Sequence, residues 1–337
     1  MIRRPPRSTQ GVSSAASDVY KRQLPKPWTL SEAEFSSIIK KFNKRYPDFN
    51  DRLKQFSKWQ VGKPYKIFCL GEETLPDVDP IFRMDVSDCT VHILTSLASI
   101  QSQNWNQAKS NLIKIHYKAG INGENIPSYK KRWHFTTDRL LFNSSTKNIT
   151  DSLLDEQDIQ RISLILNQKQ NGDEFLDLDW TKKVSVGYIP NNMINNELLN
   201  ELPSIAGIAF VKKSYFKMGL AIAHEGMIID NQSIIHASQE YEKTVQMNFL
   251  DYYFTDEGPR FDGVMFFTFH PFNYTLCNFS CYKCFSSSWR LMIKKNAITS
   301  KNIISLSIID SYPICIKLCS SIWSCLLYTS PSPRDRG

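Results

Sequence analysis

Apolar positions in the first third of the chain repeat with the period of an α-helix. Residues 29–46 carry apolar side chains three and four positions apart, which is the spacing of one helix face. Ser31 and Glu34 precede this run in the spacing of a capping box, so the helix is expected to start there. Residues 49–60 predict a second helix, which ends before Gly62.

A third helical segment, residues 88–100, is apolar over most of its surface. Such a helix is predicted to be central and buried, with Ser87 or Asp88 capping its first turn. Residues 104–120 predict a fourth helix that closes at Gly120.

From residue 182 onwards the pattern changes to short β-branched or aromatic runs between turn residues. These runs cover residues 182–190, 205–213, 220–229, 232–238 and 261–269. The polar residues 121–180 give little pattern, except that 157–170 could form a helix or a strand. Helices followed by strands predict an α+β fold, with N-terminal helices packed on a C-terminal antiparallel sheet in one domain over residues 24–269.

The two ends of the chain do not share this patterning. Residues 1–23 are rich in Arg, Ser and Pro and resemble translated sequencing-adapter sequence, the alternative being a genuine tail or transit peptide. Residues 270–337 are interpreted as a frameshifted or untranslated region that ends in a second adapter-derived stretch. They hold six of the eight cysteines; a genuine extension, forming a zinc-binding or nucleic-acid module, is the alternative.

The basic charge of the chain lies in these ends. Residues 1–23 carry a net charge of +4 and residues 270–337 carry +6, so the formal +8 leaves −2 for residues 24–269. This acidic balance gives no reason to expect nucleic-acid binding. Only Cys69 and Cys89 remain in the central region, so no disulfide framework is indicated, and no apolar run there is long enough to span a membrane.

Cys89 stands at the predicted start of the buried helix. Free N–H groups and the helix dipole favour a thiolate there, and the same N–H groups could hold an oxyanion. The alternative is an ordinary core cysteine. Asp88 beside it could cap the helix, but its charge would oppose thiolate formation.

Two histidines lie twelve positions apart in the strand region. A two-residue turn at Asp230 and Asn231 would make a hairpin that places His224 and His236 nearly opposite each other on one face. A nucleophile needs a base, and the base needs an orienting group. Cys89, His224 and His236 could supply these parts in that order; a zinc site from the same three residues is the metal alternative, without a legible fourth ligand.

Several segments together resemble a known family. They are GKPY (62–65), residues 88–98, residues 104–120, WHFTTD (133–138), YIP (188–190), AHEGMII (223–229) and IIHAS (234–238). The central region is similar to the N-acetylmuramoyl-L-alanine amidase-like family, within the NlpC-type cysteine hydrolases of papain-like fold. Asp-Cys at a helix start, then His-x-Gly, then His-Ala-Ser is the specific part of this resemblance.

The resemblance implies roles for individual residues. Cys89 would be the nucleophile, His224 the general base and His236 its orienting partner, with no cofactor and no metal. Tyr65 would lie beside the nucleophile and contact the substrate. Asp88 is a second predicted substrate contact. The remaining substrate-binding candidates are His134 and Asp138, which would line the cleft.

The implied function is hydrolysis of a cell-wall amide in peptidoglycan fragments, at the bond between muramoyl lactate and L-alanine, by a periplasmic or envelope protein. The alternatives are an endopeptidase acting between D-glutamate and a diamino acid, and a muropeptide-binding protein without catalysis. Two departures from the family pattern bear on this. Thr90 to Leu94 lack the acid that commonly follows Asp-Cys, and Gly207-Ile208 replaces a common Gly-Asp.

Overall fold

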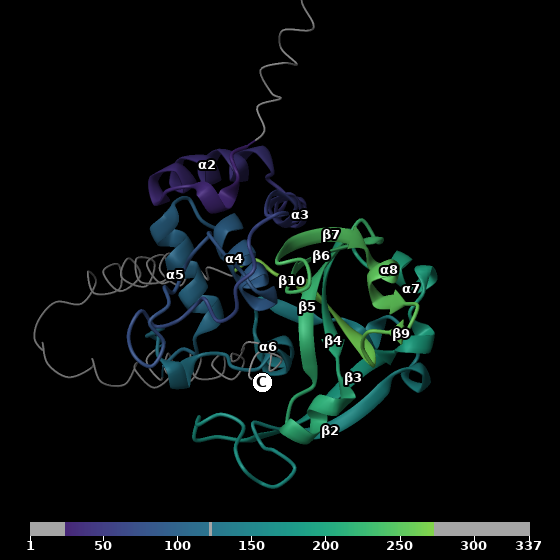
Figure 1. Ribbon diagram of the computed structural model, residues 1–337. Coiled ribbons are helices and arrows are strands. Elements are labelled where there is room, and N and C mark those ends of the chain that lie inside the picture. The colour runs from purple at the N-terminus through teal and green to yellow at the C-terminus, as the bar shows by residue number, and fades with distance from the viewer. Residues whose placement is uncertain (1–23, 121–122, 273–337) are drawn as a thin grey trace, which may run out of the picture.

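A layer of helices covers one face of a curved antiparallel sheet in the computed structural model, which describes residues 24–120 and 123–272 (Figure 1). The α+β class and the order of helices before sheet are therefore confirmed. The interpretations of residues 1–23, and of 270–337 beyond residue 272, lie outside the described residues.

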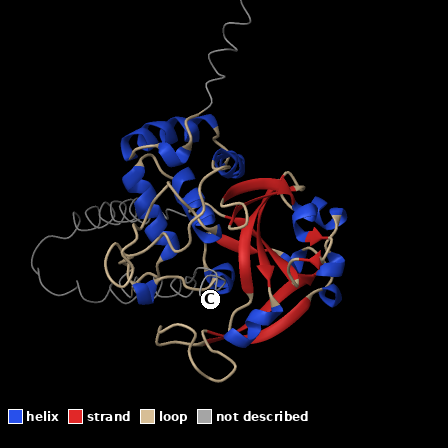
Figure 2. Cartoon of the chain, viewed as in Figure 1, coloured by secondary structure: helices blue, strands red, loops and turns tan. Residues whose placement is uncertain are grey.

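The helices on the first face of the sheet are α2 (Glu32–Arg45), α3 (Phe49–Trp59), α4 (Cys89–Ile100), α5 (Trp105–His116) and α6 (Thr136–Phe142). Two short helices, α7 (Asn196–Asn200) and α8 (Phe249–Tyr253), lie on the opposite side (Figure 2). The larger strands are β2 (Gln160–Leu166), β3 (Lys182–Pro190), β4 (Ile205–Val211), β5 (Ile222–Ile229), β6 (Ser233–Ser238), β7 (Lys243–Asn248) and β10 (Gly263–Phe269). The shorter strands are β1 (Thr146–Asn148), β8 (Phe254–Thr255) and β9 (Gly258–Pro259).

The predicted helices form, with one difference in length. Ser31 Oγ accepts from the Glu34 backbone N–H and Glu34 accepts in return from the Ser31 N–H at 2.8 Å, which completes the capping box. Helix α5 ends at His116, before Gly120, because Tyr117 is extended and its hydroxyl donates to the carbonyl of Gly71 at 2.9 Å. That long-range contact ends the helix earlier than the glycine would.

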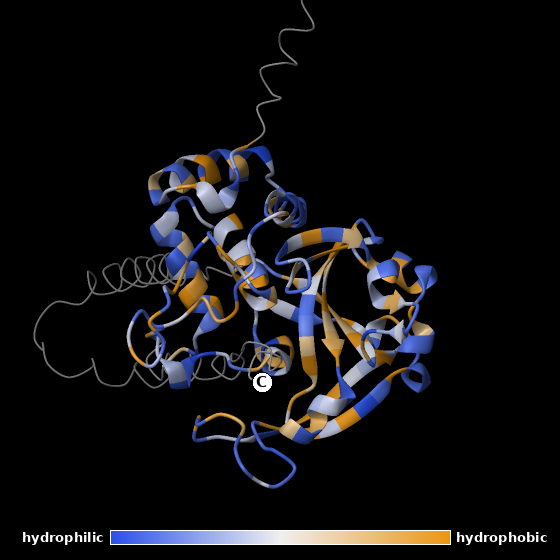
Figure 3. Ribbon diagram, in the orientation of Figure 1, coloured by the Kyte–Doolittle hydropathy of each residue, from blue (hydrophilic) through white to orange (hydrophobic). Residues whose placement is uncertain are grey.

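The main sheet has the strand order β2-β3-β10-β4-β5-β6-β7, with β1 paired to β10, and every pairing is antiparallel. Strand β4 is buried along its whole length because both faces are covered, so its sequence is continuously apolar (Figure 3). Alternate side chains of β4 and β5 pack under α2–α5 or against α7 and α8. The ambiguous segment 157–170 contains strand β2.

The hairpin of β5 and β6 has a longer turn than predicted. Ile229 pairs with Ser233, so three residues form the turn, and Asp230 and Asn231 have φ of 51° and 56°. Continued along the strands, this register sets His236 opposite residue 226, two positions from His224. The two histidines still share a face because a shift of two preserves the side-chain direction.

Candidate functional site

Cys89 is the first residue of α4, and its position follows from the cap before it. Asp88 has an extended backbone and its Oδ1 accepts from the Val91 N–H at 2.7 Å, which fixes where the helix begins. Oδ2 of Asp88 accepts from the Phe68 N–H at 3.2 Å. All twelve residues of α4 are buried, so the helix holds the Cys89 thiol at a fixed point against the sheet. Cys89 itself is 6% exposed.

Tyr65 reaches the same place from the segment 62–65, which runs between the edge strand β7 and the approach to α4. Its N–H donates to the Glu242 carbonyl at 2.9 Å, and the segment forms isolated bridges to Lys243 and Ser87. The G-x-P-Y motif therefore places an aromatic residue on the wall of the cavity that contains Cys89.

His224 and His236 form a hydrogen-bonded pair. Nε2 of His224 lies 2.8 Å from Nδ1 of His236, and the rings are nearly perpendicular. The His224 ring stacks on Phe210, with centroids 5.6 Å apart and planes 19° apart, and this packing restricts its rotation. Because Nε2 of His224 is used in this bond, Nδ1 is the ring nitrogen that could act as a base towards a reacting group.

His236 is held in its neutral form. It is 1% exposed, and burial lowers its pKa from the usual 6.5 to about 3, with the positive charge of Arg260 as a smaller cause. A neutral His236 protonated on Nε2 can accept at Nδ1 from a protonated His224. Nε2 of His236 has no hydrogen-bond partner within the described part of the chain. The tautomer is assigned from this geometry.

Gly226 allows the two strands to approach at this point. A Cβ on residue 226 would lie 3.0 Å from the carbonyl oxygen of Ile235 and 3.1 Å from Cβ of His236. The glycine of the His-x-Gly motif thus leaves room for His236.

A cavity of about 440 Å³ joins these groups. It is lined by Tyr65, Cys89, Ala223, His224, His236, Ala237, Ser238, Gln239, Glu240, Tyr252, Arg260 and Phe261. Tyr65 and the proposed catalytic trio therefore surround one space, whose volume is typical of small-molecule sites. An ion pair of Arg260 with Glu240 at 3.1 Å also belongs to the wall.

Sequence reasoning did not anticipate this ion pair or Tyr252 and Phe261. Arg260 follows the short strand β9 and Glu240 lies in a polar loop, so neither had a spacing that related it to Cys89. Their proximity depends on the sheet, which brings the β6–β7 loop and the α8–β10 segment together.

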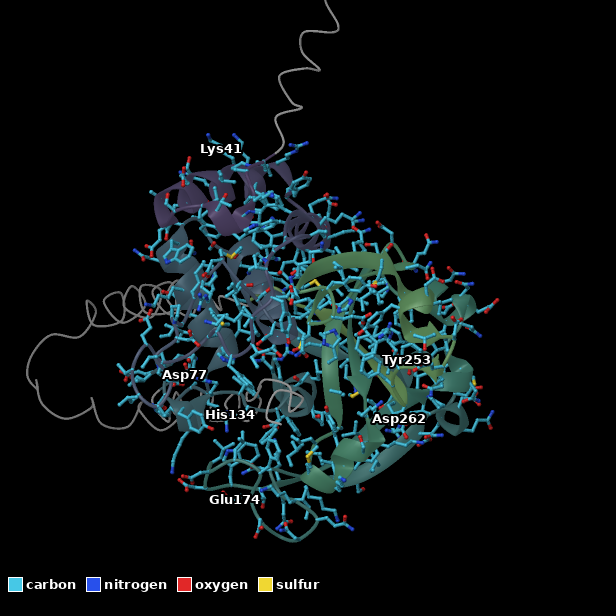
Figure 4. The ribbon with its side chains drawn as sticks, viewed as in Figure 1. Lys41, Asp77, His134, Glu174, Tyr253 and Asp262 are labelled. Atoms are coloured by element: carbon cyan, nitrogen blue, oxygen red, sulfur yellow. The ribbon has the colours of Figure 1, made fainter. Side chains whose placement is uncertain are left out.

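The other substrate-binding candidates lie outside the lining of this cavity. Asp88 caps α4, as described above. Nε2 of His134 lies 2.5 Å from the carbonyl of Tyr129, and the imidazole packs on the Tyr129 ring. In Figure 4, His134 lies near Asp77 on the helical side of the molecule, away from Tyr253.

Asp138 belongs to α6 and is almost fully buried. It accepts from Lys182 Nζ at 3.2 Å, yet burial raises its pKa from 3.8 to about 7. Burial opposes the charged form more than the partly exposed Lys182 favours it.

Within residues 24–120 and 123–272, no cluster of three or more His, Cys, Asp or Glu side chains is arranged to hold a metal ion. Across the same residues, none of the helices combines the length and the apolar character that a membrane crossing requires.

Comparison with known proteins agrees with the fold and the motifs. Residues 55–258 match the model of the family described as N-acetylmuramoyl-L-alanine amidase-like (AmiA-like). This match covers more than half of the chain, and the chain belongs to that family.

Solved structures with a similar fold include a Legionella pneumophila protein of family DUF1460, with a TM-score of 0.57 and 22% identity, covering 71% of this chain and 96% of that one. An N-acetylmuramoyl-L-alanine amidase from Bacteroides uniformis gives a TM-score of 0.48 and 18% identity, covering 68% of this chain and 99% of that one. No match was found among curated proteins. The family supports a peptidoglycan amidase-like function.

Proposed function

We propose that this protein is a cysteine-dependent amide hydrolase of peptidoglycan fragments, with an NlpC-type, papain-like arrangement of its site. The observation that carries the proposal is the 2.8 Å bond between His224 and His236 in the cavity that also contains Cys89. A nucleophile, a base and an orienting group from three elements are the parts that such chemistry requires.

In the proposed reaction, Nδ1 of His224 takes the thiol proton of Cys89, and the thiolate attacks the carbonyl carbon of an amide. The positive end of the α4 dipole and the backbone N–H groups at the start of the helix would support the thiolate and the oxyanion, except for the N–H of Val91, which donates to Asp88. His224 then returns the proton to the leaving amine. A water molecule, deprotonated by His224, attacks the thioester and releases the acid with the free thiol.

The scissile bond is proposed to be the one between muramoyl lactate and L-alanine, which is the bond in the family's name. Tyr65 would contact the substrate at the cavity wall. Asp88, His134 and Asp138 remain predicted substrate contacts, although they do not line this cavity, so Tyr65 is the stronger candidate. The proposed location is the periplasm or cell envelope, where such a substrate is found.

The test compares wild-type protein with Cys89→Ala and Cys69→Ser. Cys69 is a second buried thiol, whose pKa burial raises to about 11, so its substitution is a matched control. Purified muropeptides are incubated with each protein and the products are identified by mass spectrometry. Free stem peptide from the wild type and Cys69→Ser, but not from Cys89→Ala, is the expected result.

Two other results would change the proposal. Cleavage within the stem peptide, between D-glutamate and the diamino acid, would retain Cys89 as the proposed nucleophile and change the bond that the enzyme is proposed to cleave. Binding of intact muropeptide by wild type without any cleavage would refute the hydrolase and leave a binding protein.

A further inference from the structure

A buried carboxylate connects the two elements that carry Cys89 and His224. Glu225 follows His224 in β5, and its side chain points to the opposite face of the sheet, towards α4. There its Oε1 accepts from the Thr90 hydroxyl at 2.7 Å. Thr90 is the residue after Cys89. A single hydrogen bond thus joins the neighbour of the proposed nucleophile to the neighbour of the proposed base.

The second oxygen of the same carboxylate pairs with Arg139 of α6. Nη2 of Arg139 donates to Oε2 of Glu225, and the two side chains are 0% and 1% exposed. Nε and Nη1 of Arg139 have no hydrogen-bond partner within the described residues. Glu225 is therefore the counter-charge of the buried Arg139 guanidinium. One oxygen of its carboxylate accepts from α4 and the other accepts from α6.

An ion pair at this depth is weak evidence for stability. The desolvation of two charges cancels much of their attraction, and well-packed apolar residues often replace such pairs without loss. Its position suggests a different role. The pair is neutral overall, so it can hold α4 against β5 without adding a negative charge that would oppose ionisation of Cys89.

We propose that Glu225 is a positioning residue for catalysis, acting through Thr90 and held by Arg139. Its carboxylate fixes the first turn of α4 relative to β5, and so sets the approach of the Cys89 thiol to the His224 ring. This inference rests on the proposed function, because it assigns the alignment of that same site.

The sharpest variant is Thr90→Val, which replaces the hydroxyl by a methyl group of nearly the same size. Thr95→Val is the matched control, because Thr95 lies in the same buried helix and donates only to its own helix, at the Val91 carbonyl, at 2.6 Å. Thr90→Ser keeps the hydroxyl and is expected to restore most of what Thr90→Val loses. Thr90→Ala removes the hydroxyl with less bulk and covers the case in which the valine variant does not fold.

Two readouts on the full chain separate positioning from simple loss of structure. The first is steady-state hydrolysis of muropeptide, where Thr90→Val is expected to lower kcat about tenfold or more with little change in KM, since misalignment slows the chemical step. The second is the pH dependence of alkylation of Cys89 by iodoacetamide, followed by peptide mass spectrometry. Loss of the His224 contact should move its midpoint upwards towards that of an ordinary thiol, about 8.5.

The outcomes are distinct. A folded Thr90→Val protein with wild-type kcat and an unshifted alkylation midpoint would overturn the inference and leave the proposed function standing. The same holds if Thr95→Val causes equal losses. If the wild type hydrolyses no muropeptide, the proposed function fails, and the alkylation midpoints alone decide whether the Thr90–Glu225 bond aligns Cys89.

Discussion

The hydrogen bond between the two histidines leads to a quantitative prediction about His236. Nδ1 of His236 lies 2.8 Å from Nε2 of His224, and the lowered pKa of His236, about 3, keeps it a neutral acceptor. In the proposed mechanism His224 becomes positively charged, so the bond strengthens as the reaction proceeds. A hydrogen bond to a charged group contributes about 1.5–3 kcal/mol, and each 1.36 kcal/mol corresponds to a tenfold change in rate.

Replacing His236 by Phe keeps an aromatic ring of similar size and removes the acceptor. We expect kcat to fall by about 10- to 100-fold. Asn at the same position keeps an acceptor oxygen and should retain more activity than Phe. Without the acceptor, the imidazolium of His224 is less stable, so the alkaline limb of the kcat/KM profile should move to lower pH.

The assay is hydrolysis of muropeptide between pH 5 and 10, with circular dichroism to confirm that each variant is folded. A folded His236→Phe protein with unchanged kcat and an unchanged alkaline limb would refute the orienting role. A loss that is equal for Phe and Asn would point to packing as the cause.

Two further predictions concern stability and strand spacing. Burial lowers the pKa of His92 to about 3, so below pH 6.5 the unfolded chain binds a proton that the folded protein does not; stability is lost as pH falls, by about 2 kcal/mol at pH 5. The raised pKa of Asp138 has the opposite effect on stability in the wild type, so the two proteins must be compared. Between pH 7 and pH 5, the free energy of unfolding of His92→Gln, measured by urea titration, should fall by about 2 kcal/mol less than that of the wild type. Parallel pH dependences of the two free energies would contradict the assignment. Gly226→Ala should push the strands apart at His236, lowering stability by about 1–3 kcal/mol and kcat several-fold, as thermal melts and kinetics can show; full activity would mean that the strands yield without moving His236.

Local signals predicted the parts of the fold that local physics controls. The capping box at Ser31 and the cap at Asp88 each satisfy N–H groups within three residues, so sequence spacing was sufficient to locate the start of α2 and to narrow the cap of α4 to Ser87 or Asp88. The end of α5 was missed because Tyr117 is fixed by Gly71, 46 residues away, and no local pattern encodes that contact.

The residues of the candidate site also divide into those that local motifs predict and those that only the folded sheet brings together. Cys89, His224 and His236 were found because each occurs in a recognisable motif, and the chain brings all three to one cavity. The hairpin register differed by one position because the turn includes a third residue, which only the packing of the turn determines: Asp230 pairs with Lys54 and Lys58, and Asn231 donates to the Leu199 carbonyl. Glu225 and Arg260 had no motif, and their relation to the site depends on the folded sheet.

The site draws on both layers of the molecule, and this has a consequence for synthesis on the ribosome. Cys89 and His236 are separated by most of the domain, and the sheet that carries the histidines also requires β10, which follows them. At translation rates of about 5–20 residues per second, a nascent chain has its cysteine for roughly 7–30 s before the second histidine of the hairpin has been made. In the proposed mechanism, the growing polypeptide has a thiol without its base throughout that interval, so hydrolytic capacity would appear only when residues 24–269 have all emerged.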